Sequence, residues 1–169
     1  MSEEYLDYVP PQYLGKSGIT LRCRLAMAAI LTSAFKPEKI TAVIGPRKGS
    51  SRVLFLVWNW IYSEVTIIAD GFGTHGGEGG AGLSAVLGLI KFYKIPLFQA
   101  RLDNQELFQE LAEGHLTEEI FDAVVADEQA YNWKFYYVSE VKKEKKDNKQ
   151  VLEVYWYGKE DWTIPLPSR

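Results

Sequence analysis

Residues 65–82 read VTIIADGFGTHGGEGGAG, a β-branched run followed by a stretch in which seven of the twelve residues from Gly71 to Gly82 are glycine. Glycine loses more conformational entropy on folding than other residues, so this concentration indicates positive φ angles or a close approach of the backbone to something else. Residues 83–93 then carry apolar side chains at helical spacing. We therefore predict a strand, a glycine-rich loop and a helix, with loop amides that can bind an anion such as phosphate.

The segments on either side continue the alternation of strands and helices. Residues 39–44 form a β-branched run that ends at Gly45-Pro46, and residues 96–102 form another strand. Residues 50–64 are ambiguous between a strand and a helix, and their length and leading serines favour a helix. This order predicts a βαβαβ unit, and hence an α/β, Rossmann-like fold with a mostly parallel sheet flanked by helices. Both glycine-containing loops would lie at the carboxyl ends of parallel strands, where such sheets bind ligands.

The 169 residues are expected to form a single domain with three parts. Residues 1–16 are interpreted as an irregular N-terminal arm, residues 17–130 as the Rossmann-like core, and residues 131–169 as an aromatic β-hairpin extension. In the extension, residues 133–141 and 150–157 alternate aromatic and polar side chains on either side of a turn, which predicts an antiparallel β-hairpin. One of its faces is expected to pack on the core.

Composition limits the class of protein and its setting. Hydrophobic residues make up 47% of the chain and the formal net charge is −3, as in globular rather than disordered proteins. The single cysteine, Cys23, excludes an internal disulfide and favours the cytoplasm, and with only His75 and His115 beside it no zinc cluster can form. The apolar runs are shorter than the roughly 20 residues of a bilayer span, and the acidic N-terminus does not resemble a secretory signal. We expect no membrane segment, no metal and no resident cofactor.

Charge is distributed unevenly along the chain. Two predicted helices, 104–113 and 117–130, belong to a stretch between Leu102 and Trp133 that holds nine acidic residues and no Lys or Arg. Lysines cluster at the tip of the predicted hairpin, but the overall pI is about 5.5. Because phosphate neutralisation supplies most of the non-specific affinity for nucleic acids, a nucleic-acid partner is not expected.

Three segments resemble the SLOG superfamily of Rossmann-like domains, which includes the LOG phosphoribohydrolases, the DprA-type proteins and small uncharacterised phage and bacterial members. They are ITAVIGPR at 40–47, VTIIADGFG at 65–73 with the glycine-rich helix start that follows, and KIPLF at 94–98. The resemblance covers about residues 40–103 and implies that Arg47 contacts the phosphate or base of a nucleotide-like ligand while the glycine amides hold its phosphate. LOG enzymes carry Gly-Gly-x-Gly-Thr-x-x-Glu, and residues 71–78 approach this motif with one additional residue before Glu78, the candidate catalytic group.

The expected function is the binding or sensing of a small phosphorylated, nucleotide-derived ligand. The candidate ligand-binding residues are Gly45, Arg47, Ser50, Gly71, Gly73, Thr74, His75, Gly76, Gly77, Glu78 and Gly79. One alternative is an N-glycosidic hydrolase of nucleotides with Glu78 and Arg47 as its principal groups. A second alternative is a protein-interaction module that uses the aromatic hairpin, with a merely structural glycine loop. The aromatic content and the resemblance both favour a homo-oligomer.

Overall fold

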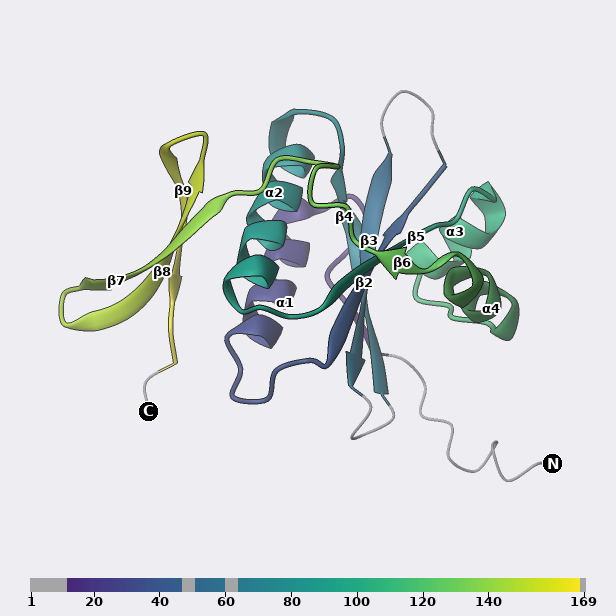
Figure 1. Cartoon of the computed structure of the whole chain (residues 1–169), viewed down its shortest axis with the longest axis horizontal. Helices are drawn as coiled ribbons and strands as arrows, with labels where there is room; N and C mark the ends of the chain where they lie inside the picture. The colour runs from purple at the N-terminus through teal and green to yellow at the C-terminus, as the bar shows by residue number, and fades with distance from the viewer. Residues whose placement is uncertain (1–11, 47–50, 60–63, 168–169) are drawn as a thin grey trace.

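The computed structural model describes residues 12–46, 51–59 and 64–167, and these form two separate β-sheets with four helices (Figure 1). The part of the chain built around the larger sheet contains β1 (Gln12–Leu14), α1 (Thr20–Leu31), β2 (Lys39–Ile44), β3 (Arg52–Asn59), β4 (Glu64–Gly73), α2 (Gly77–Phe92), β5 (Leu97–Arg101), α3 (Gln105–Ala112), α4 (Glu118–Asp127) and β6 (Gln129–Ala130). The smaller sheet contains β7 (Glu140–Lys146), β8 (Lys149–Trp156) and β9 (Lys159–Pro165). The predicted α/β class is confirmed, and the C-terminal part forms a separate antiparallel sheet of three strands, where a two-stranded hairpin was expected.

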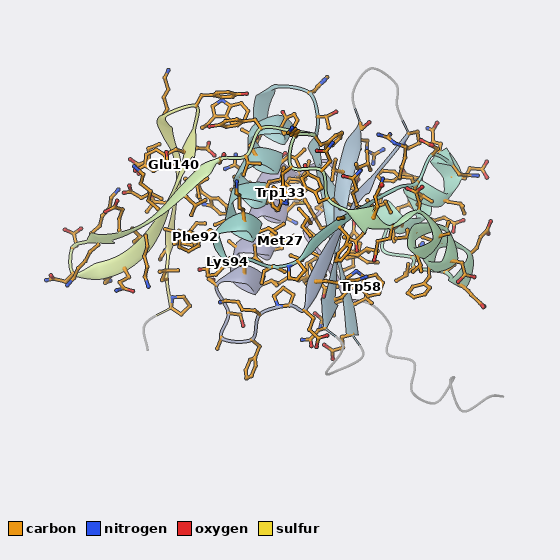
Figure 2. The ribbon with its side chains drawn as sticks, viewed as in Figure 1. Met27, Trp58, Phe92, Lys94, Trp133 and Glu140 are labelled. Atoms are coloured by element: carbon orange, nitrogen blue, oxygen red, sulfur yellow. The ribbon has the colours of Figure 1, made fainter. Side chains whose placement is uncertain are left out.

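Helices cover both faces of the six-stranded sheet, whose strand order is β1-β4-β3-β2-β5-β6. One core cluster joins α1 and α2 to the sheet and includes Met27, and the other joins α3 and α4 to the opposite face and includes Trp58 (Figure 2). Leu152 and Val154 of β8 belong to the first cluster, so the smaller sheet packs on the outside of α2. Asn104 and Thr117 cap α3 and α4, which begin where the sequence places them.

The prediction of a helix at residues 50–64 is wrong, because Arg52–Asn59 form strand β3. Its side chains alternate between the two cores: Val53, Phe55 and Val57 pack with α1 and α2, whereas Leu54 and Leu56 pack with α3 and α4. A strand that is covered on both faces is apolar at every position. Periodicity therefore cannot distinguish it from a buried helix.

This strand changes the topology of the sheet. β3 pairs antiparallel with β2 and with β4, so these three strands form an antiparallel meander and the predicted βαβαβ unit is not formed. The parallel pairings are β2 with β5 and β1 with β4, and β6 pairs antiparallel with β5. The sheet is therefore mixed, with α2 crossing from the end of β4 to the start of β5 (Figure 1).

The glycine-rich stretch is not the long loop that was predicted. Gly71 and Gly73 belong to β4, residues 74–76 form the turn, and α2 already begins at Gly77. The amides of the following glycines are therefore mostly part of a helix, and the region available to a ligand is reduced to the turn and the first turn of α2.

Three glycines of α2 lie where other chain segments approach closely. A Cβ added at Gly82 would lie less than 3.0 Å from the Thr20 side chain of α1. A Cβ at Gly80 or Gly88 would lie equally close to residues 136–139, which run along the outside of the helix. These glycines are required by packing, since real Cβ atoms do not tolerate such distances.

Two predicted boundaries are corrected. Residues 133–139 form no strand; the antiparallel ladder joins β7 to β8 and then β8 to β9, so the predicted hairpin is a three-stranded sheet shifted toward the C-terminus. The predicted irregular arm contains β1, which pairs in parallel with β4 along Thr66–Ile68.

Candidate ligand site at the amino end of α2

Gly45, after β2, and Thr74, after β4, lie at the same edge of the larger sheet, the upper edge in Figure 1. The start of β3 stands between them. The Gly45 N–H donates to the Arg52 carbonyl at 2.8 Å, and the Thr74 N–H donates to the Ser51 carbonyl at 2.9 Å. The Ser51 N–H in turn donates to Thr74 Oγ1 at 2.8 Å. The structure thus brings the ends of the two predicted loops together.

Two of the predicted glycines, Gly45 and Gly71, are packing positions at this edge. A Cβ at Gly45 would lie 3.0 Å from the Phe108 ring, and one at Gly71 would lie 2.7 Å from Cys23 Sγ. Gly73 pairs with Arg52 in the ladder between β3 and β4. Gly45 and Gly71 therefore shape the edge, and the amide of Gly45 is already hydrogen-bonded to Arg52.

The amino end of α2 is the open part of the site. Gly76 occupies the N-cap position with φ −51° and ψ −170°, and no side chain caps the helix. His75, Gly76, Gly77 and Glu78 are all exposed. A Cβ at Gly76 or Gly77 would have no atom within 4 Å, and Gly77 has a φ of 77° that favours glycine.

This helix end has the electrostatics of an anion site with one opposing charge. The first amides of a helix have no intrahelical acceptor, and the helix dipole places partial positive charge there. Glu78 lies in the first turn, and its negative charge would repel a bound anion. Gly79, the last predicted residue, lies half-buried in the same turn.

Arg47 and Ser50 lie outside the described residues, but two other arginines stand at this edge. Arg101 Nη1 donates to the Gly45 carbonyl at 3.3 Å. Arg52 pairs with Asp70, whose side chain is fully buried and whose Oδ1 accepts no hydrogen bond within the described part of the chain. Neither arginine was predicted as a site residue. The signal for the pair was Asp70 itself, a charged residue at the end of a buried β-branched run.

Three aromatic residues form a cluster near the first turns of α2. The rings of Tyr137 and Tyr157 stack with centroids 3.9 Å apart at an interplanar angle of 10°, and Trp156 contacts both edge-on. Tyr136, which precedes Tyr137 in the chain, contacts α2, since its Oη lies 2.5 Å from the position of a Cβ at Gly80. Burial, and after it the neighbouring Tyr157, raises the pKa of the Tyr136 hydroxyl. The cluster therefore adjoins the amino half of α2.

Two surface hollows lie away from this site. One is bounded by Ile30, Phe35 and Val57 at the opposite edge of the sheet, and the other lies on the outer surface of α3 beside Glu106 and Glu110. Within the described ranges, no three His, Cys, Asp or Glu side chains lie together as metal ligands, and no helix is long and apolar enough to cross a membrane.

No family model and no curated protein matches the chain. Among solved structures, a chain of respiratory complex I from Thermus thermophilus is similar, with a TM-score of 0.59 and 18% sequence identity. The match covers 74% of the present chain and 98% of that chain. At this identity the likeness concerns the fold alone.

Proposed function

We propose that this protein binds a small phosphorylated, nucleotide-derived ligand at the amino end of α2. The observation that carries the proposal is the exposed, uncapped start of a 16-residue helix with two unobstructed glycines, Gly76 and Gly77. The ligand class comes from the resemblance of residues 71–78 to the SLOG motif, and not from the superfamily's parallel topology, which β3 interrupts. The single cysteine fits a cytoplasmic setting, in which such ligands are abundant.

The expected interaction is modest in size. The dipole contributes about 0.3–1 kcal/mol, and each hydrogen bond from an amide to a charged phosphate oxygen adds about 1.5–3 kcal/mol net. Glu78 reduces this sum by like-charge repulsion at the same helix end. We therefore expect binding in the micromolar to millimolar range, stronger at low ionic strength because the site is exposed.

Thermal unfolding with a panel of nucleoside 5′-monophosphates tests the proposal. A ligand at about 100 times its dissociation constant adds about 2.7 kcal/mol, which raises Tm by roughly 5–10 °C for a chain of this size. The decisive variant is Gly76→Asp, whose carboxylate would accept from the free amides and occupy the site. The φ of −51° and the empty space around Gly76 accommodate this side chain.

The Gly76→Asp protein should keep or raise its own Tm and lose the ligand-induced shift. Asn104→Asp is the matched control, since it places the same charge at the exposed N-cap of α3, where a side-chain cap already exists. An undiminished shift in Gly76→Asp, or no shift with any nucleotide in the wild-type protein, would reject the proposed site.

The same incubation separates a binder from an N-glycosidic hydrolase. Released base, detected by chromatography, would indicate the hydrolase with Glu78 as its acid or base. Glu78→Gln discriminates further: it should abolish base release in a hydrolase, whereas in a binder it should tighten binding by removing the opposing charge.

A protein-interaction module is the second candidate, because the aromatic cluster includes Tyr157, which is 64% exposed. Exposed aromatic rings are enriched at the centres of protein interfaces. The aromatic content of the chain favours a homo-oligomer, in which the partner is a second copy of this chain. Light scattering of the wild-type protein tests self-association, since a monomer at all concentrations would exclude it.

A further inference from the structure

The turn between β8 and β9 consists of Tyr157 and Gly158, and its sequence departs from what its geometry favours. Trp156 pairs with Lys159, so the loop has two residues, and both have positive φ, 47° at Tyr157 and 82° at Gly158. Such type I′ turns favour Asn-Gly, because asparagine tolerates this conformation and a bulky side chain does not. A tyrosine here costs backbone strain, and strain of this kind clusters at functional sites.

The ring of Tyr157 has one covered face and one open face. Tyr137 stacks on it at 3.9 Å between centroids, and the Tyr157 N–H donates to Tyr137 Oη at 3.1 Å. Trp156 contacts the pair with its edge, at 4.7 Å from Tyr157 and 5.6 Å from Tyr137. Since Tyr157 is nevertheless 64% exposed, its second face is available to another ring. The three aromatic residues hold this face in a fixed orientation.

The turn that contains Tyr157 lies on the same side of the molecule as the amino end of α2. Figure 1 shows both the turn between β8 and β9 and the start of α2 at the top of the view. Tyr136, which precedes Tyr137 in the chain, connects the two features, because its Oη lies 2.5 Å from the position of a Cβ at Gly80 in α2. A ligand with a phosphate at α2 and a planar ring some distance from it would match this arrangement.

We propose that the open face of Tyr157, backed by Tyr137 and Trp156, is a stacking subsite for the base of the nucleotide. This inference rests on the proposed function, which it deepens by assigning the planar ring of the ligand to a subsite separate from the phosphate. Base stacking on aromatic side chains tolerates every base, since each has a π-face. The subsite therefore selects nucleotides over phosphorylated sugars without selecting one base.

The test uses three probes: adenosine 5′-monophosphate, ribose 5-phosphate and adenosine, with affinities measured by titration calorimetry. Stacking of one base is worth about 1–3 kcal/mol, which converts to about a 5- to 150-fold advantage of adenosine 5′-monophosphate over ribose 5-phosphate. Tyr157→Asn removes the ring and supplies the residue that the turn favours, so the protein should remain at least as stable as the wild type. Phe35→Asn is the control, because it removes an exposed ring, 74% accessible, from the loop after α1.

The expected result is that Tyr157→Asn abolishes this advantage and leaves ribose 5-phosphate binding unchanged, while Phe35→Asn changes neither. Equal affinity of the wild-type protein for the two phosphorylated probes, or an undiminished advantage in Tyr157→Asn, would overturn the stacking subsite while the phosphate site stands. If ribose 5-phosphate does not bind but adenosine binds and loses its affinity in Tyr157→Asn, the phosphate site fails and the ring subsite is supported. Absence of all binding, or self-association that Tyr157→Asn abolishes, overturns the subsite in favour of a protein-binding surface.

Discussion

Loss of the Arg52 guanidinium should destabilise the protein through the carboxylate that it leaves behind. The Asp70 side chain is fully buried in β4, and its ion-pair partner is Arg52, the first residue of β3. The other carboxylate oxygen of Asp70 accepts no hydrogen bond from the described residues. We choose Arg52→Met because methionine retains most of the aliphatic stem and removes the guanidinium, whose central carbon lies 5.4 Å from the centroid of the Phe108 ring.

The size of the effect follows from the exposure of the two partners. Removing one member of a buried pair costs about 3–5 kcal/mol, because the remaining charge is then buried without a partner. The Arg52 side chain is 50% exposed, so water reaches part of the vacated space and the expected loss is smaller, about 2–3 kcal/mol. For a chain of this length that loss lowers Tm by roughly 4–12 °C.

Urea unfolding of a double-mutant cycle provides the measurement. Arg52→Met should lose about 2–3 kcal/mol in the wild-type background but less than about 1 kcal/mol when Asp70→Asn has already removed the charge. Arg22→Met, at an exposed position of α1, is the matched control and should change stability by less than about 0.5 kcal/mol. An equal loss in both Asp70 backgrounds would show that packing, and not the buried charge, explains the effect.

Three further predictions concern packing, a buried hydrogen bond and pH. Gly82→Leu should lower the free energy of unfolding by about 1–3 kcal/mol, because any side chain at this position meets Thr20. Gly79→Ala should raise the free energy of unfolding by about 0.5–1 kcal/mol, because the nearest atom to the added Cβ is 3.5 Å away. Thermal melts in which both variants change stability in the same direction would contradict the close crossing of α1 and α2. Thr41→Val should lower the free energy of unfolding by about 1–3 kcal/mol in urea titrations. The fully buried Thr41 hydroxyl accepts a hydrogen bond from Trp58 Nε1 and donates one to Glu128, each at 2.9 Å. A loss below about 0.5 kcal/mol would mean that Trp58 and Glu128 find other hydrogen-bond partners in the variant. A hydrogen bond from Lys146, and after it one from Tyr155, lowers the pKa of the Glu153 carboxyl below its unfolded value. The resulting stabilisation is therefore present above about pH 4.3 and is lost as pH falls through the lowered folded pKa. Carboxyl NMR should find a higher titration midpoint of Glu153 in Lys146→Met, and an unchanged midpoint would refute the assignment.

Local patterns sufficed for the elements whose signals lie within a few residues of each other. The signals are the helical patterns at 104–113 and 117–130, the β-branched runs of β2 and β4, and the helical spacing after Gly82, and each depends on residues inside one element. The α/β class followed from these elements. The identity of β3 did not, because its buried faces are covered by helices that lie far away in the sequence.

The candidate site shows the same division. The sequence by itself determined that glycines follow β4 and that a helix begins near them, since both are properties of a short contiguous stretch. Only the tertiary structure decided which glycines pack against α1 and residues 136–139 and which remain open at Gly76 and Gly77. It also placed the turn between β8 and β9, about 80 positions further along the chain, on the same side of the molecule as this helix end. Steric exclusion and ring stacking depend on distance in space, and spacing along the chain carries no information about such partners until the sheet and helices have assembled.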